Sequence, residues 1–218
     1  MSTRLLRSLV AVPAAVAAAS VMTAATDAPR TWTVRPGGGV SMMTPAQAGR
    51  LTVTDTSTGT AIACSPSGNV AAAGGFTGGT GLPGRGIGSI TNVNFNPCTG
   101  PRGATFFFKA TSLPWRVNLL SFDAATRVVT GSITGVQFRV SVPHVCRAVV
   151  DGTSGTAANG VIRFTYADAT AVLKTLSTGG NLHFFGVSRG CGALLRGGDP
   201  AAVSVTLVVS NPQTITSP

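Results

Sequence analysis

The chain has 218 residues, with 16 Lys and Arg, six acidic residues that are all Asp, and a formal net charge of +10 at pH 7. With no Glu and so few Asp, the paired carboxyl groups of most glycosidases are not expected. The length is enough for one domain with a sizeable core and short for two.

The N-terminus has the pattern of a secretory signal peptide. Arg4 and Arg7 precede an apolar run from Leu9 to Val21. Thr23 and Ala25 suit the positions before a cleavage site, so we expect cleavage near Ala25. The alternative is a retained membrane anchor, but the run is shorter than the roughly 20 residues that a bilayer core requires. We therefore expect a secreted or cell-envelope-associated protein.

The chain divides into three expected parts: a signal peptide over 1–25, an N-terminal extension with a first short strand over 26–49, and one domain over 50–218. A helical turn fits Thr44–Arg50, because Thr44 could cap it and Pro45 suits its first position. No apolar segment after the signal peptide is long enough to span a membrane.

From residue 50 onward, short segments alternate apolar and polar residues and are separated by turn-forming clusters at roughly 8- to 12-residue spacing. The clearest strands are Val136–Val142 and Val203–Val209, each with one apolar face. This pattern predicts an all-β, antiparallel sandwich or barrel-like domain. Hairpins are expected at Asp55–Thr60, Asp123–Arg127 and Ala167–Thr170, where Asp55, Asp123 and Asp168 would bond their own backbone.

Two segments lack this alternation. Gly, Ala and Thr dominate Ala71–Gly86, which predicts a mobile surface loop. The apolar run Phe106–Phe108 predicts a strand buried on both faces or placed at a sheet edge.

We interpret Trp115 as a core anchor, with an exposed binding platform as the alternative.

Two stretches, Gly88–Phe95 and Gly131–Phe138, nearly repeat each other at an offset of 43 residues. We interpret them as two equivalent strands of a pseudo-symmetric sandwich. Chance recurrence is the alternative in a chain so rich in Gly, Thr and Val.

The cysteines Cys64, Cys98, Cys146 and Cys191 predict two disulfides in an exported chain. Three pairings are possible. We favour Cys64–Cys98 and Cys146–Cys191, because each pair lies within one half of the chain and would link strand ends. No cysteine pair has the short spacing of a zinc site, so no metal is predicted.

The sequence evidence for catalytic residues is weak. Ser188 lies in a G-x-S-x-G string, but no histidine follows it, as a hydrolase of that class requires. His144, Asp151 and Ser188 occur in the order of a chymotrypsin-like triad without its surrounding motif. We expect His144 in a loop near a disulfide and His183 facing solvent from a strand. The sequence thus predicts no catalytic residue and no cofactor.

A resemblance is carried by ten short strings spread along the chain: Trp32–Val34, Thr54–Thr56, Thr58–Thr60, Gly86–Thr91, Cys98–Pro101, Leu113–Trp115, Asp123–Thr126, Val150–Ser154, Thr178–His183 and Gln213–Pro218. With these strings the chain resembles uncharacterised secreted proteins of actinobacteria. The resemblance implies export and a four-cysteine framework, but no activity.

These observations favour a non-enzymatic extracellular binding or surface protein. Its positive charge favours anionic cell-envelope polymers as partners, although the Arg content could merely reflect genome composition. The basic residues are scattered singly, so no specific nucleic-acid partner is predicted. The alternatives are a secreted hydrolase using Ser188, His144 and Asp151, and a membrane-active β protein.

Overall fold

The computed structural model describes residues 30–45, 50–64, 71–95, 97–191 and 194–218. The expected signal peptide lies outside these ranges. So do residues 46–49, which hold most of the expected helical turn.

Strands make up nearly all of the regular structure. The helical pieces in the described ranges are two three-residue 3-10 turns, η1 (Pro101–Gly103) and η2 (Arg189–Cys191). No helix there is long and apolar enough to cross a membrane.

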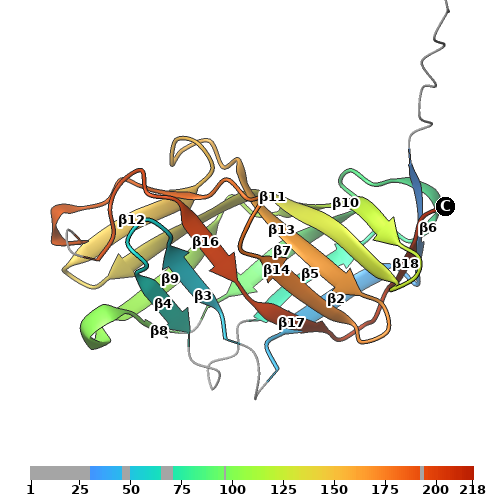
Figure 1. The fold of residues 1–218 in the computed structure, drawn as a ribbon, viewed down its shortest axis with the longest axis horizontal. Coiled ribbons are helices and arrows are strands. Elements are labelled where there is room, and N and C mark those ends of the chain that lie inside the picture. The colour runs from blue at the N-terminus through green and yellow to red at the C-terminus, as the bar shows by residue number, and fades with distance from the viewer. Residues whose placement is uncertain (1–29, 46–49, 65–70, 96, 192–193) are drawn as a thin grey trace, which may run out of the picture.

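Eight antiparallel strands close into a barrel, which we call the first ring (Figure 1). Pairing between β10 and β11 closes it. In order around the ring, the strands are β10 (Trp115–Asp123), β7 (Gly88–Asn94), β5 (Ala71–Phe76), β2 (Gly38–Met43), β17 (Thr206–Val209), β14 (Val172–Leu176), β13 (Gly160–Ala167) and β11 (Val128–Val142).

A second ring uses the C-terminal half of β11. Its ends meet at a single bridge between His183 and Pro200. The two rings lie next to each other along the long axis of the molecule (Figure 1). Following β11, the strands are β9 (Thr105–Thr111), β8 (Cys98–Thr99), β4 (Ala61–Cys64), β3 (Thr52–Asp55), β16 (Ala201–Ser204), β15 (His183–Phe185) and β12 (Cys146–Asp151). The predicted all-β antiparallel fold is confirmed, in its barrel form.

A small sheet joins the two ends of the described chain. It has the order β18 (Thr214–Thr216), β1 (Thr31–Arg35) and β6 (Gly79–Pro83), and it lies at the end of the molecule where Figure 1 marks the C-terminus. The segment expected as an N-terminal extension therefore holds two strands, β1 and β2, and β2 is part of the first ring.

β11 passes from one ring to the other at a bulge. Residues up to Thr134 pair with β10, and residues from Gln137 onward pair with β9 and β12. The register shifts between Thr134 and Val136, and Gly135 between them has a φ of +80°. Residues other than glycine rarely adopt this backbone conformation, so glycine suits the point where β11 crosses between the rings.

The expected strand over 203–209 also crosses between the rings. Its four alternating apolar residues are all buried, as predicted. It divides at Val205 into β16, which pairs with β3 in the second ring, and β17, which pairs with β14 and β2 in the first.

Both predicted disulfides are confirmed. Cys64 bonds Cys98 and thereby ties β4 to β8, and Cys146 bonds Cys191 and ties β12 to η2. All four cysteines are buried in the hydrophobic core. By the chain-entropy account, closed loops of 34 and 45 residues correspond to about 4 kcal/mol of stabilisation each.

The prediction of a mobile loop over Ala71–Gly86 is wrong. This segment forms β5 and β6, and β5 pairs with β2 on one side and β7 on the other. Its small residues allow close approach, since a Cβ on Gly74 would collide with the Ser89 carbonyl oxygen. In the sequence, a segment with few large side chains looks like a loop. Here the small residues of β5 allow its backbone to lie close to those of β2 and β7.

The prediction that Phe106–Phe108 is buried on both faces or at an edge is also wrong. β9 lies between β8 and β11 and alternates. Phe106 and Phe108 are buried, but Phe107 is 42% exposed. Of these three aromatic residues, Phe107 therefore stands on the outer face of the second ring.

All three predicted hairpins are present, joining β3 to β4, β10 to β11 and β13 to β14. Asp55 and Asp123 accept backbone N–H groups of their own turns, as expected. Asp168 does not. Its carboxylate accepts the N–H of Ile215 in β18 and lies 3.6 Å from Arg127. Asp168 therefore anchors the C-terminal strand.

The two near-repeats are strands on either side of β10. Ile90 of the first pairs with Trp115, and Ile133 of the second with Val117. The rings of the corresponding residues Phe95 and Phe138 pack at a centroid distance of 6.0 Å. Their similar sequences thus occupy similar positions beside one strand, and the duplication itself stays a prediction.

We predict that Gly135→Val lowers the free energy of unfolding by about 1–2 kcal/mol, because a side chain is strained in this backbone region. Chemical denaturation of the oxidised mature chain measures the change. Gly39→Ala is the control, since the φ of Gly39 is not in the positive region and its new Cβ would meet only the Gly74 oxygen, at 3.9 Å. Equal stability of Gly135→Val and wild type would contradict the proposed role of the bulge.

Candidate functional site

The three candidate hydrolase residues do not form a hydrogen-bonded group. The Ser188 hydroxyl accepts the N–H of Arg147 at 3.0 Å and lies 3.6 Å from the sulfur of Cys191. His144 is exposed in the turn between β11 and β12, as predicted. Asp151 is four residues further along β12 than Arg147, or roughly 13 Å at the usual rise of a strand. Ser188 therefore supports the disulfide region structurally.

The Asp151 carboxylate holds a loop in place. It accepts the N–H groups of Gly152, Ala158 and Asn159 and an amide N–H of Gln137, at 2.6–3.0 Å. Burial alone would raise the pKa of Asp151, but these four hydrogen bonds together lower it below its usual value. The loop over 152–159 thus folds over this end of β12.

His183 lies next to that loop. Its Nδ1 is 3.2 Å from the Gly152 carbonyl oxygen and 2.9 Å from that of Asn181. His183 lies on a strand, as predicted, but it is half-buried between the buried neighbours Leu182 and Phe184 and does not face solvent fully. Its ring nitrogen fastens the loop to β15.

The other aromatic candidates are structural. Trp115 is buried in the core, as predicted, and its indole N–H donates to the Thr111 carbonyl. Tyr166 is also buried, and its hydroxyl bonds both the N–H and the carbonyl of Gln213. Burial raises the pKa of Tyr166, with a smaller contribution from Asp168. The five main pockets in the described part of the chain do not gather these residues with His144 and His183.

No metal site is found among the described residues, since no three His, Cys, Asp or Glu side chains cluster there.

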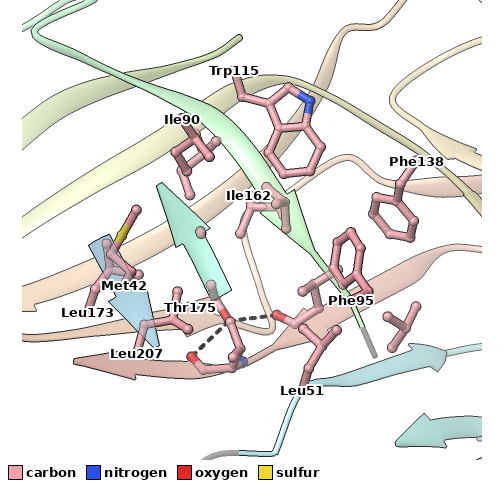
Figure 2. Close-up of a pocket in the computed structure, with 16 residues that line it drawn as sticks. Met42, Leu51, Ile90, Phe95, Trp115, Phe138, Ile162, Leu173, Thr175 and Leu207 are labelled. Carbon is pink, nitrogen blue, oxygen red and sulfur yellow. Dashed lines mark hydrogen bonds between the residues drawn. The ribbon is translucent and has the colours of Figure 1, made fainter. Parts of the chain in front are cut away.

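An apolar cavity of about 60 Å³ lies where the two rings meet. Figure 2 shows Trp115, Ile162 and Phe138 on one side of it and Met42, Leu173 and Leu207 on another. The one polar side chain lining it, Thr175, already bonds the Val203 carbonyl and the Val205 N–H. A cavity of about 150 Å³ is what accommodates a benzene molecule. This space is therefore a packing gap at the junction of the rings.

A cationic groove crosses the outer face of the second ring. Its residues are Phe107, Phe108, Lys109, Arg139, Val140, Ser141, Arg147, Ala148, Val149 and Gly186. Lys109, Arg139 and Arg147 are all exposed, and no carboxylate lines the groove.

Strand register brings these three cations together. Lys109 lies directly opposite Arg139, and Arg147 lies opposite Ser141, two residues along from Arg139. Side chains opposite each other on neighbouring strands have Cβ atoms about 4.5–5.5 Å apart. Phe107 lies opposite Ser141 on the other side, so an exposed ring borders the cations.

The loop held by Asp151 borders the groove at the next row of the sheet. Phe185 pairs with Val149, and Gly155 of the loop lies against the Phe185 side chain. The Asp151 carboxylate is buried and turned towards loop N–H groups. Among the described residues, Asp151 thus forms no ion pair with the cations of the groove.

Two further depressions lie on the outer face of the first ring, and both are lined by Arg85 and Arg116. Each has two cations instead of three. Asn118, which lines one of them, already bonds Thr134 and the N–H of Gly86.

The sequence did not indicate the groove because its cations lie 30 and 8 residues apart along the chain. Only the pairing of β9, β11 and β12 makes them neighbours. One signal was available, since Arg139 occupies an outward position in the strand that was predicted over 136–142.

Comparison with protein-family models, with curated proteins and with solved structures finds no match for this chain.

We predict that Asp151→Asn lowers the free energy of unfolding by about 2–3 kcal/mol near pH 7, because one amide oxygen cannot accept four donors and its NH₂ opposes them. The lowered pKa of Asp151 means that its stabilising effect is complete above the unfolded pKa of about 3.9 and is lost as the pH falls through the folded value. The difference in free energy of unfolding between wild type and Asp151→Asn should therefore become smaller below about pH 4.

Denaturation at a series of pH values measures this gap. The pKa of Asp168 is raised by burial, which outweighs its bonds to Ile215 and Arg127, but Asp168 titrates in both proteins and cancels in the difference. Asp123→Asn, in an exposed turn, is the control. A gap that stays constant from pH 7 to pH 3 would contradict the assignment.

Proposed function

We propose that this chain is a secreted, cell-envelope-associated protein that binds anionic envelope polymers through its surface charge and has no catalytic role. The observation that carries the proposal is the distribution of charge over the folded chain. Of the 14 Lys and Arg in the described ranges, 13 are exposed, and Arg163 is half-buried. Of the five Asp there, Asp123 is the one that is exposed.

Three of the five described acidic side chains accept backbone N–H groups inside the protein. Asp55 and Asp151 are buried and accept backbone N–H groups, and Asp168 fastens the C-terminal strand. In the described ranges, a single ion pair joins opposite charges, between Arg127 and Asp168. The surface cations other than Arg127 therefore have no carboxylate partner among the described residues and remain available to an external polyanion.

Two further observations support export. The two disulfides are typical of proteins that fold in an oxidising compartment. The sequence begins with a signal-peptide pattern.

We expect the mature chain, residues 26–218, to sediment with isolated cell envelopes at low salt and to be released at high salt. Raising the salt from about 0.01 M to about 1 M shortens the screening length from roughly 30 Å to roughly 3 Å. Quantifying the protein in pellet and supernatant across this range makes the measurement. A neutral polysaccharide gel is the control and should retain nothing. Envelope binding that is absent at low salt, or that high salt leaves unchanged, would rule the proposal out.

A further inference from the structure

We propose that the cationic groove on β9, β11 and β12 binds the phosphate groups of a phosphate-bearing envelope polymer. This inference rests on the proposed function and assigns it a site and a ligand chemistry. The groove is the place where three exposed cations, Lys109, Arg139 and Arg147, line one surface depression without a carboxylate.

The placement of the cations is unfavourable without an anion. Like charges directly opposite on neighbouring strands destabilise a sheet, and Lys109 lies opposite Arg139. Arg139 has the neutral Val149 as its partner on the other side. An anion in the groove removes the repulsion between Lys109 and Arg139 and contacts Arg147 as well.

The number and kind of donors favour phosphate over carboxylate. Each Arg offers a planar fork of N–H donors that fits a phosphate or a carboxylate. One Arg satisfies a single carboxylate, whereas phosphate presents more oxygens and, as a monoester, up to two charges near neutral pH. Two Arg, one Lys and the half-buried Ser141 hydroxyl together match a phosphate group or two successive phosphodiesters.

The surroundings favour a sugar- or polyol-phosphate polymer over a single-stranded nucleic acid. Proteins that bind single strands stack successive bases on several aromatic side chains. Among the described residues that line this groove, Phe107 is the one exposed aromatic, because Phe108 is buried. The neighbouring Phe185 is half-buried against Gly155. One ring can contact one apolar unit of a polymer but offers no stacking ladder.

The test is calorimetric titration of the mature chain with inorganic polyphosphate. The groove variant combines Lys109→Ala, Arg139→Ala and Arg147→Ala. The matched control combines Arg85→Ala, Arg116→Ala and Lys174→Ala, which removes three exposed charges from the first ring. All six side chains are exposed, and thermal unfolding confirms that both variants fold.

We expect the groove variant to bind polyphosphate at least about tenfold more weakly than wild type, and the control less than about threefold more weakly. The slope of log K against log salt should fall by about 2 in the groove variant, since each lost phosphate contact removes about 0.7–0.9. Polyglutamate of equal charge should bind more weakly than polyphosphate.

Equal losses in both variants would overturn the groove assignment and leave diffuse surface binding, so the proposed function would stand. Equal affinity for polyglutamate would overturn phosphate as the ligand. Tighter binding of single-stranded DNA that Phe107→Ala abolishes would replace the envelope polymer with nucleic acid. If wild-type protein sediments with envelopes but does not bind polyphosphate, this inference alone is refuted. If it neither sediments with envelopes nor binds polyphosphate, both proposals are refuted.

Discussion

Hydrogen bonding along β11 joins the two rings. A strand has two edges, so it can belong to two closed rings only if its neighbours change part-way along its length. β11 does this within 15 residues, exchanging β10 and β13 for β9 and β12. The bulge at Gly135 marks the exchange. The segment over 201–209 crosses back in the same way, dividing around Val205. Each ring therefore contains one part of β11 and one part of the 201–209 segment, and the other parts of both belong to the other ring.

The cationic surface follows from the way turns and chain ends are held. Four of the five described Asp accept backbone N–H groups: Asp55, Asp123, Asp151 and Asp168. The Asp side chain is short, so a carboxylate that bonds the backbone stays close to it. Three of these four side chains are largely buried. Lys and Arg place their charge at the end of a long stem that reaches water. Folding therefore separates the two signs of charge, and the surface is more cationic than the composition alone indicates.

The parts of the fold that the sequence predicted correctly are local. Alternation over 136–142 and 203–209 records which face each side chain takes, and the hairpins depend on a few adjacent turn residues. Ring closure is not local, because the same alternation suits a sandwich and a barrel. The errors have the same origin. Ala71–Gly86 forms strands because β2 and β7 approach β5 closely, and Phe107 faces outward because its pairing with Ser141 fixes its side of the sheet.

The groove differs from an ordinary charged sheet face in the residues that lie opposite its cations on the neighbouring strands. Outward positions on β11 do not require charge, since Gln137 and Ser141 on the same face are neutral. The position opposite Arg139 on β12 could hold a carboxylate, yet it holds Val149. One row further along β12, this face does contain an acid, Asp151, but loop N–H groups and Gln137 occupy it. The sheet thus offers places where the three cations could be paired and leaves them unpaired, although pairing would stabilise the strands. Fold stability does not explain that arrangement, which agrees with the proposed binding of an external anion.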